Sequence, residues 1–305
     1  ALAIDVMLPF ADGAALARAF GLAAPINDGY AVIWTTTPWT LPSNQAVSVH
    51  PALDYALVRT ARGHLVLADA LVERCLKRYQ LEGEVIARCV GAQLERVDAR
   101  HPFYERDSLL ICGEHVSAED GTGLVHTSPA YGVEDFNALK PYTAEVINPV
   151  QGDGRFAADL PLFGGMKIAE ANPQIVAHLR TLGRVLAGFD YDHSVAHCWR
   201  HKTPTIFRAT PQWFISMEQA GLRTQAMTAI DTVRWVPDWG RERIEGMIQN
   251  RPDWCISRQR TWGVPIALFV DKVHQAPHPR SVELMEQVAQ RIEVAGVDAW
   301  YDLYP

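Results

Sequence analysis

Residues 121–136 bring together several polar side chains that could act on a ligand. The segment reads GTGLVHTSPAYGVEDF, with a Gly-Thr-Gly turn and a short apolar run before the polar residues. The apolar run predicts the end of a buried strand, and the proline and glycine after it predict turns. The side chains that follow the strand end are His126, Thr127, Ser128, Glu134 and Asp135. Such a series is typical of a polar pocket on a rigid edge, and a solvated loop with a capping Asp is the alternative.

Residues 34–44, WTTTPWTLPSN, form a second polar stretch. Its threonine hydroxyl groups belong to Thr35, Thr36, Thr37 and Thr40. Pro38 and Pro42 fix their own φ angles and lack N–H donors, so regular strand pairing must end near them. An ordinary Thr-rich edge strand is the alternative interpretation. Beside the first stretch, these hydroxyls would suit a ligand that carries an ammonium group, a ribose and an ester.

Both stretches resemble motifs of one protein family. The segment WTTTPWTLP resembles the threonine-rich peptide of the editing domain of isoleucyl-tRNA synthetases, and GTGLVHTSPAYGVEDF resembles the second editing motif of the same family. Valyl and leucyl enzymes usually have an Arg where this chain has Thr37, and they lack the Pro-Trp-Thr continuation. The resemblance extends to about Trp262 and therefore covers most of the chain.

The resemblance implies hydrolytic proofreading of mischarged valyl-tRNA(Ile), the post-transfer editing step of these enzymes. Valine lacks one methylene of isoleucine, and a hydrophobic pocket distinguishes the two by only about 1–3 kcal/mol, a limit for which this family is itself the standard example. A second site that admits the smaller amino acid and hydrolyses its ester completes the selection. The chain is therefore expected to be an isoleucine-tRNA ligase fragment with aminoacyl-tRNA ester hydrolase activity.

The resemblance also implies roles for individual residues. Asp135 would bind the α-ammonium group, with Glu134 as the competing carboxylate. The threonine hydroxyls would bind the terminal ribose, the carbonyl or the water, and His126 would exclude the extra methylene by its shape or act as a general base. Trp262 would line the isoleucine pocket of the synthetic site, or would simply pack in a core. The remaining expected substrate contacts are Trp39, Asn44, Thr127, Ser128 and Gly132.

One position departs from the family pattern. Many relatives have a Gly-His pair where this chain has Ala130 and Tyr131. Tyr131 is bulkier than His and could narrow the entrance to the pocket. Because Gly132 and Asp135 are intact, we interpret the change as a tolerated variant.

Two rival functions remain open from the sequence. The first is a tRNA-docking module without chemistry of its own. The second is the editing domain of a sister enzyme specific for valine or leucine, against which the continuation from Thr37 to Thr40 speaks. Deacylation of mischarged tRNA by the chain would exclude the docking module. The identity of the mischarged tRNA that is deacylated fastest would distinguish an isoleucine-specific editing domain from one of a sister enzyme.

The composition indicates a soluble cytoplasmic protein. Of 305 residues, 48% are hydrophobic and 21% charged, and no apolar run approaches the roughly 18 residues that a membrane span needs. The first residues contain no basic stretch, so we expect no signal peptide. Five scattered cysteines, an odd number, favour reduced thiols over a disulfide framework.

The charge distribution suggests local contact with RNA. The net charge is −7, yet residues 193–262 hold ten Lys and Arg against six Asp and Glu. A basic segment on an acidic body suits a protein that touches RNA at one place. The expected partners are the acceptor end of tRNA(Ile), the amino acids valine and isoleucine and the remainder of the synthetase, with the protein as a monomer.

The predicted elements place a β-rich domain first, so the fold class is α+β. Strands are expected at 30–34, 46–49, 55–59, 65–67, 85–90 and 108–111, with helices at 14–20 and 70–79. Asn172 and Pro173 are expected to begin a further helix. The resemblance implies a barrel-like editing domain at 1–188, linker strands at 189–250, a partial Rossmann-type catalytic portion at 251–270 and the start of a second insertion at 271–305.

The sequence predicts no cofactor for editing. His197, Cys198 and His201 lie close together, but no CxxC pair occurs anywhere, so we expect no zinc site. The HIGH-type and KMSKS-type motifs of complete synthetases are absent from this sequence. ATP and Mg²⁺ would therefore belong to the full-length enzyme, and this chain alone is not expected to form isoleucyl-adenylate.

Overall fold

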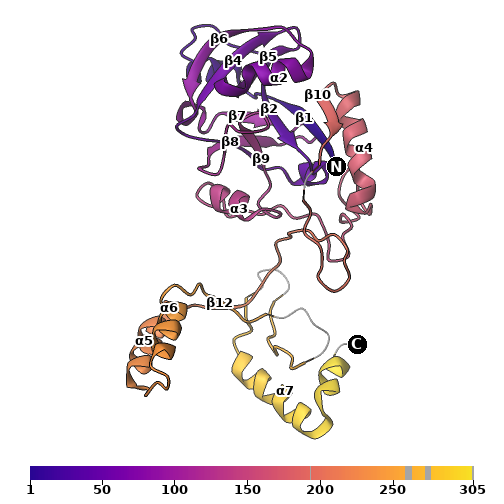
Figure 1. Ribbon diagram of the computed structural model, residues 1–305. Helices are drawn as coiled ribbons and strands as arrows, with labels where there is room; N and C mark the ends of the chain where they lie inside the picture. Colours follow the sequence, from indigo (N-terminus) through magenta and orange to yellow (C-terminus); the bar gives the residue numbers. More distant parts are fainter. Residues whose placement is uncertain (193, 258–262, 272–275, 304–305) are drawn as a thin grey trace. The chain divides into compact units, whose positions relative to one another are not determined.

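The chain divides into two compact units, Ala1–Ala209 and Thr210–Pro305, which are described separately (Figure 1). The computed structural model describes residues 1–192, 194–257, 263–271 and 276–303. Within these ranges no helix is long and apolar enough to cross a membrane. The division after Ala209 reflects only which residues pack together. The four domain ranges expected from the sequence therefore stay predictions.

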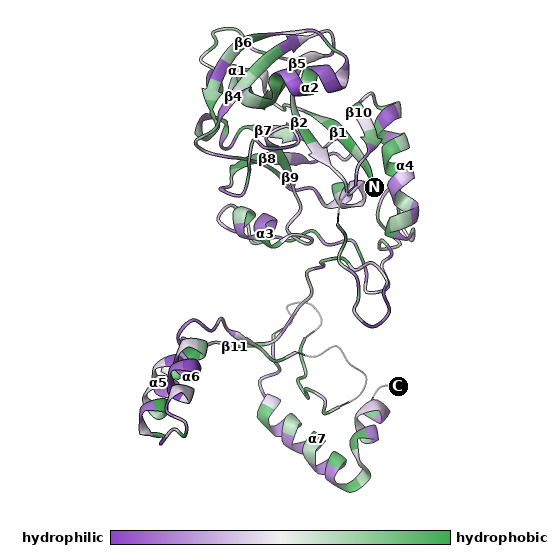
Figure 2. Ribbon diagram, in the orientation of Figure 1, coloured by the Kyte–Doolittle hydropathy of each residue, from purple (hydrophilic) through white to green (hydrophobic). Residues whose placement is uncertain are grey.

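The largest sheet of the first unit has six strands in the order β10-β1-β2-β5-β4-β6. Its members are β1 (Leu2–Pro9), β2 (Gly29–Thr35), β4 (Asp54–Thr60), β5 (Gly63–Ala68), β6 (Gly83–Val90) and β10 (Val185–Asp190). Strand β2 pairs in parallel with β5, and the other neighbours are antiparallel. The central residues of β1, β2, β4 and β5 are mostly apolar and buried, and these strands show hydrophobic stretches in Figure 2, whereas β6 and β10 are largely half-buried.

A second sheet has four strands in the order β7-β8-β3-β9. Its members are β3 (Ala46–Val49), β7 (Asp98–Arg100), β8 (Asp107–Cys112) and β9 (Leu124–Thr127). Strand β9 pairs antiparallel with β3, which places His126 opposite Val47. The predicted mixed α+β character is confirmed, while the described strands form two open sheets rather than one closed barrel.

Helices cover these sheets and complete the first unit. They are α1 (Gly13–Ala19), α2 (Val72–Tyr79), α3 (Val133–Leu139) and α4 (Ile168–Thr181), with the 3₁₀ segments η1 (Pro38–Ser43), η2 (Asp69–Leu71) and η3 (Gly91–Leu94). Helix α4 packs against η1 and β10. The main core joins both sheets with α1, α2 and α4, and includes Ile4, Leu16, Ile33, Leu57, Leu110, Phe156 and Leu179, while Leu139 of α3 packs in a second, smaller cluster.

Strand β1 was not expected from the sequence. Its residues are almost all buried, so the alternation of apolar and polar side chains that marks a half-exposed strand is missing. Asp5 interrupts the apolar run, yet its carboxylate is fully buried. It accepts hydrogen bonds from Arg78, at 2.7 Å, and from the Tyr79 hydroxyl, at 2.9 Å. The partners of Asp5 come from α2, which local sequence could not reveal.

Two helices differ from the sequence-based expectation. Helix α3 occupies residues that were expected to form only a turn, and Asp135 lies in its first helical turn. Helix α4 begins at Ile168, so Pro173 lies inside it and Asn172 is not its N-cap. The Asn172 side chain accepts a hydrogen bond from the backbone N–H of Trp39 instead, at 2.8 Å. That contact joins α4 to η1.

The second unit contains short elements with few buried side chains. They are β11 (Phe214–Ile215), β12 (Trp254–Cys255), α5 (Leu222–Thr232), α6 (Trp239–Gln249), α7 (Ser281–Ala295), η4 (Gln219–Gly221) and η5 (Val297–Leu303). Strands β11 and β12 pair with each other. Linker strands were expected within 189–250, and residues 206–208 in that range form none. The Rossmann-type assignment stays a prediction, and Trp262 lies outside the described residues.

Candidate active site

The threonine-rich segment runs from the end of β2 into η1. Thr35 is the last residue of β2, and Thr40 lies within the 3₁₀ turn. Three contacts from distant parts of the chain hold this turn: Asn172 accepts from the Trp39 N–H, His101 donates to the Leu41 carbonyl at 2.8 Å, and Arg106 donates to the Pro42 carbonyl. The hydroxyl groups therefore project from a segment whose backbone is fixed on both sides.

The threonine hydroxyls differ in the number of hydrogen bonds that they already form within the protein. Thr35 accepts the backbone N–H of Thr37 at 3.0 Å, and the two hydroxyl oxygens lie 3.3 Å apart. Thr40 donates its hydroxyl proton to the Thr37 carbonyl at 2.8 Å. Within the part of the chain that the structure describes, the Thr36 hydroxyl takes part in no side-chain hydrogen bond. Thr36 is thus the member of the group most available to a ligand.

His126 is a buried, neutral imidazole with both nitrogens engaged. Its Nδ1 lies 2.8 Å from the Asn44 amide nitrogen, which also donates to the Ala46 carbonyl. The amide orientation is fixed by that second bond, so Nδ1 accepts and Nε2 carries the proton. Nε2 then donates to the Thr40 hydroxyl at 2.9 Å. Burial and, to a smaller extent, the Arg106 charge lower the pKa of His126 to about 4.

Asp135 reaches back from the first turn of α3 towards the strand end. Its Oδ2 accepts the backbone N–H of Ser128 at 2.8 Å. A Cβ on Gly132 would lie 3.0 Å from the Asp135 carboxyl carbon, so the glycine leaves room for this side chain. The pKa of Asp135 is raised to about 6, chiefly by burial and also by the Glu134 charge, against the opposing effect of the hydrogen bond from the Ser128 N–H. Glu134 itself is exposed.

These side chains surround one cavity of about 310 Å³. Its lining is Trp34, Thr35, Thr36, Thr37, Thr40, Val125, His126, Ser128, Tyr131 and Asp135. All four expected threonines, His126, Ser128 and Asp135 therefore meet at one place. Their individual roles stay predictions.

Four other expected residues lie elsewhere. The Thr127 hydroxyl lies 2.6 Å from that of Ser48 on β3, behind the cavity wall, and is fully buried. Asn44 supports His126 and is also fully buried. Gly132 contributes space around Asp135, and Trp39 lines an adjoining groove. None of the four lines the cavity itself.

Three further residues belong to the site and were not predicted from the sequence: Trp34 and Val125, which line the cavity, and Asn172, which holds the threonine-rich segment. Trp34 directly precedes the threonines, so its position beside them was a usable signal. Its indole N–H is buried and has no hydrogen-bond partner in the described structure. No signal in the sequence connected Asn172 with the threonine-rich segment, because 133 positions separate it from Trp39.

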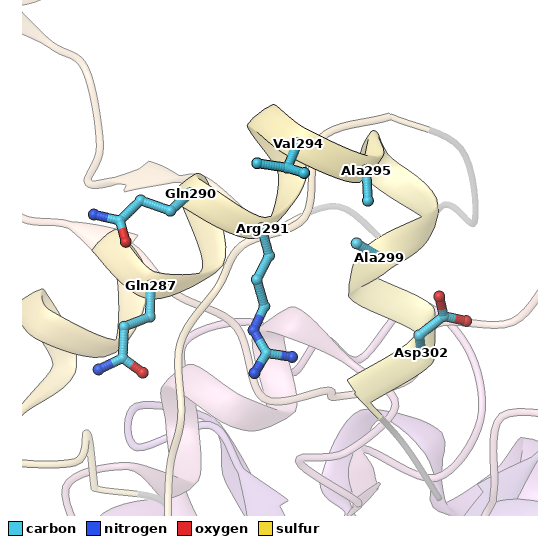
Figure 3. A pocket seen from close by; sticks show the side chains of 7 residues that line it. All are labelled: Gln287, Gln290, Arg291, Val294, Ala295, Ala299 and Asp302. Carbon is cyan, nitrogen blue, oxygen red and sulfur yellow. The ribbon is translucent and has the colours of Figure 1, made fainter.

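A larger hollow, of about 590 Å³, lies on the second unit between α7 and η5 (Figure 3). Its side chains include Gln287, Gln290 and Arg291, and Figure 3 shows the Asp302 carboxylate directed away from the Arg291 guanidinium. No hydrogen bond between its lining side chains supports a built site among the described contacts. Size alone does not make this hollow the functional site.

No group of three or more metal-ligating side chains occurs in the described part of the chain. Cys198 and His201 approach each other, with 3.5 Å between Sγ and Nδ1, and hydrogen bonds lower the pKa of the Cys198 thiol. Two such ligands fall short of the four that a structural zinc site needs.

Comparison with known proteins supports the resemblance seen in the sequence. The family model of tRNA synthetases class I (I, L, M and V) matches residues 33–304. The isoleucine–tRNA ligase of Azoarcus sp. (strain BH72) is 52% identical over 99% of this chain, and that of Pseudomonas aeruginosa (strain LESB58) is 53% identical over 98%. The chain spans 33% of the length of each of these relatives.

The fold also resembles a solved structure. The cytosolic leucyl-tRNA synthetase editing domain of P. knowlesi superposes with a TM-score of 0.50 at 8% identity, over 60% of this chain and 95% of that one. At this identity the likeness concerns the fold alone. Because the family model matches residues 33–304, nearly nine-tenths of this chain, the chain belongs to the class I tRNA synthetases of the isoleucine, leucine, methionine and valine group.

Proposed function

We propose that the first unit hydrolyses the ester bond of valyl-tRNA(Ile) and so proofreads isoleucine attachment. The observation that carries the proposal is one cavity in which Asp135 faces the same space as His126 and a group of threonine hydroxyls. Editing needs a group that binds the α-ammonium, a place for water near the ester carbonyl and donors for the oxyanion.

Asp135 suits the ammonium group. It is the carboxylate that lines the cavity, and it keeps an oxygen beyond the one bonded to Ser128. A cation beside it would form a charge-assisted contact and would offset the cost of burying its charge. The exposed carboxylate of Glu134 does not line the cavity, which favours Asp135 over Glu134.

His126 acts through position and shape in this proposal, rather than as a general base. Nε2 already carries a proton that it donates to Thr40, and Nδ1 already accepts from Asn44. With a pKa of about 4, the ring is also a weak acceptor of a proton from water. His126 would thus fix Thr40 and limit the space for the amino-acid side chain.

The hydroxyls of Thr36 and Thr37 would place the water and bind the ester. A direct attack by water fits this site, since no cavity hydroxyl is paired with a proton-accepting histidine. The attacking water would lose its proton to solvent or through a neighbouring ribose hydroxyl, the ester C–O bond to the ribose would break, and the released ribose oxygen would take up a proton. Catalysis would then consist mainly of positioning and oxyanion stabilisation.

For the whole protein we propose an isoleucine–tRNA ligase, the name carried by the relatives that share 52–53% identity. The tRNA acceptor end, valine and isoleucine would be its ligands, and ATP with Mg²⁺ would serve the synthetic site of the full-length enzyme. We propose a cytoplasmic, monomeric enzyme and no zinc in this region. The predicted absence of adenylate formation by this chain can be checked by pyrophosphate exchange.

Single-turnover deacylation tests the editing proposal. The 305-residue chain is mixed in excess with tRNA(Ile) carrying radiolabelled valine or isoleucine, and with valyl-tRNA(Val) as a control. Rapid loss of the valyl label from tRNA(Ile), with isoleucyl-tRNA(Ile) spared, is expected. Binding without deacylation would favour a docking module. Mischarged tRNA(Val) and mischarged tRNA(Leu) are assayed in parallel, and faster clearance of either would favour a sister specificity.

A further inference from the structure

The active-site cavity adjoins a second hollow. This groove has a volume of about 410 Å³ and a mainly apolar lining that includes Trp39, Ile168 and Phe207. The cavity and the groove share four lining residues, which are Thr36, Thr37, Thr40 and Tyr131. Residues that face two hollows at once form the wall between them. Three of the four are threonines, so Tyr131 supplies most of the bulk of that wall.

The Tyr131 ring is held in place at three points. Its hydroxyl accepts from the Ser43 hydroxyl and donates to the Asn148 side chain, with both distances 3.3 Å. Its ring packs edge-on against Trp39, with 4.8 Å between the ring centres. Since Ser43 and Trp39 belong to η1, the ring is fixed to the same segment that carries Thr40.

The loop that carries Tyr131 is also clamped. The backbone N–H of Ala209 donates to the Ala130 carbonyl at 2.7 Å, and the Asn148 amide donates to the Ala209 carbonyl at 2.6 Å. The Tyr131 N–H donates to the Ser128 carbonyl at 3.0 Å. Such a clamped aromatic ring cannot easily turn aside for a larger ligand, because each rotation breaks several contacts.

We propose that Tyr131 is a specificity-determining residue that sets the largest amino-acid side chain the site accepts, by separating the cavity from the apolar groove. The inference rests on the proposed editing function and adds a second size-selecting group to His126. The two groups limit different volumes. His126 is enclosed, so shortening it adds only a small closed space. Shortening Tyr131 would open the cavity into the groove and admit much longer apolar side chains.

The experiment measures the acyl-group range of three chains. The parent, Tyr131→Ala and Tyr131→Phe are compared in single-turnover deacylation of tRNA(Ile) acylated chemically with valine, isoleucine or phenylalanine. Tyr131→Ala is expected to lower the preference for valyl over isoleucyl ester at least about tenfold. It should also hydrolyse phenylalanyl ester, which the parent spares. Tyr131→Phe keeps the ring and its contact with Trp39, so it should keep the parent's preference.

His126→Ala, measured alongside, should gain activity towards isoleucyl ester but little towards phenylalanyl ester, because it opens no path to the groove. An unchanged valyl-to-isoleucyl preference in a folded Tyr131→Ala, with an active parent, overturns the inference and leaves the editing proposal standing. A parent that hydrolyses no valyl ester overturns both. If thermal unfolding shows that Tyr131→Ala is not folded, Tyr131→Leu decides: it removes the aromatic ring but keeps apolar bulk against Trp39, and an unchanged preference counts against Tyr131.

Discussion

At the scale of single residues, Asp135 lies where its own charge is disfavoured. Burial raises its pKa from 3.8 to about 6. A carboxyl group with a raised folded-state pKa favours the folded state below about pH 3.8 and loses that contribution as the pH rises through about 6. At neutral pH the ionised group therefore opposes folding until a cation binds beside it. Such a cost is expected of a group retained for binding rather than for stability.

Replacing Asp135 by Ala should slow deacylation of valyl-tRNA(Ile) about tenfold to a hundredfold. A charge-assisted contact contributes roughly 1.5–3 kcal/mol, and its loss also releases the ester carbonyl from its position. Single-turnover rates at saturating protein measure the effect, with tRNA binding measured in parallel and expected to change little. Glu134→Ala is the matched control, and its deacylation rate should be close to that of the parent. An inactive Glu134→Ala beside an active Asp135→Ala would show that the wrong carboxylate was chosen.

The deacylation efficiency kcat/KM should rise between pH 5 and 7, with a midpoint near the Asp135 pKa of about 6. Only the ionised carboxylate pairs with the ammonium group, so activity is lost as the pH falls through that value. Rates corrected for spontaneous ester hydrolysis provide the measurement. Asp135→Asn keeps an acceptor for Ser128, should lose this inflection, and should be as stable as the parent or more stable at pH 7. A midpoint that persists in Asp135→Asn would assign the titration to another group.

His126→Ala should let the site hydrolyse correctly charged isoleucyl-tRNA(Ile), because the extra methylene would no longer meet the imidazole. Valyl-tRNA hydrolysis should persist at a reduced rate, since Thr40 and Asn44 lose the partner that aligned them. Comparison of the two single-turnover rates checks this. If the variant spares isoleucyl-tRNA as well as the parent does, His126 does not limit side-chain size. Complete loss of valyl-tRNA hydrolysis in a folded variant would instead support a general base.

At the scale of elements, η1 is positioned by side chains that reach it from outside. Asn172 on α4 accepts the Trp39 N–H, His101 donates to the Leu41 carbonyl, and Arg106 donates to the Pro42 carbonyl. Burial lowers the pKa of His101 to about 3, so it is neutral and offers one N–H to that carbonyl. Because η1 carries Thr40, Trp39 and Ser43, these contacts decide where both the hydroxyls and the Tyr131 wall lie.

Asn172→Ala should destabilise the first unit by about 1–3 kcal/mol, because the partly buried Trp39 N–H loses its acceptor. Deacylation should slow as well, since the threonine hydroxyls lose a fixed support. Urea unfolding and single-turnover rates measure the two effects. Gln174→Ala, an exposed change in the same helix, is the matched control and should alter neither. Parent-like behaviour of Asn172→Ala would show that His101 and Arg106 suffice to hold η1.

At the scale of the whole molecule, the core and the candidate active site belong to the same unit. All the residues of the two buried hydrophobic clusters lie between Ile4 and Leu179, and every residue that lines the cavity lies between Trp34 and Asp135. In the described part of the second unit, the buried hydrophobic side chains are Met217, Ile230 and Val288. The elements of that unit therefore contribute little to the core that supports the site.

A chain shortened to residues 1–209 should fold cooperatively and keep deacylation activity within about threefold of the full chain, because it keeps both clusters and the bonds from Ala209 to the Tyr131 loop. Thermal unfolding and single-turnover deacylation of the same preparation provide the check. Ending the chain at residue 188 removes those bonds and is the informative comparison. An unfolded 1–209 chain would show that the second unit stabilises the first.

The sequence by itself determined the chemical groups of this site and much of the local structure. The run of threonines, His126 and Asp135 were recognisable because spacing along a chain is preserved in a turn, a strand end or a first helical turn. Helix α2 and strands β3, β4 and β8 were predicted for the same reason, since their apolar periodicity is a local property. The family followed from the two motifs, and the relatives confirm it.

Only the tertiary structure decided which groups face the ligand and in which protonation state. The neutral state of His126 depends on burial and on the Arg106 charge, and its tautomer depends on Asn44 and Thr40, which lie 82 and 86 positions away. Thr127 turns towards Ser48 rather than the cavity because β9 pairs with β3. Asn172 serves η1 instead of capping a helix, and Asp5 is buried because α2 supplies its partners. Burial and hydrogen bonds between distant residues depend on how the elements pack, which local spacing does not encode.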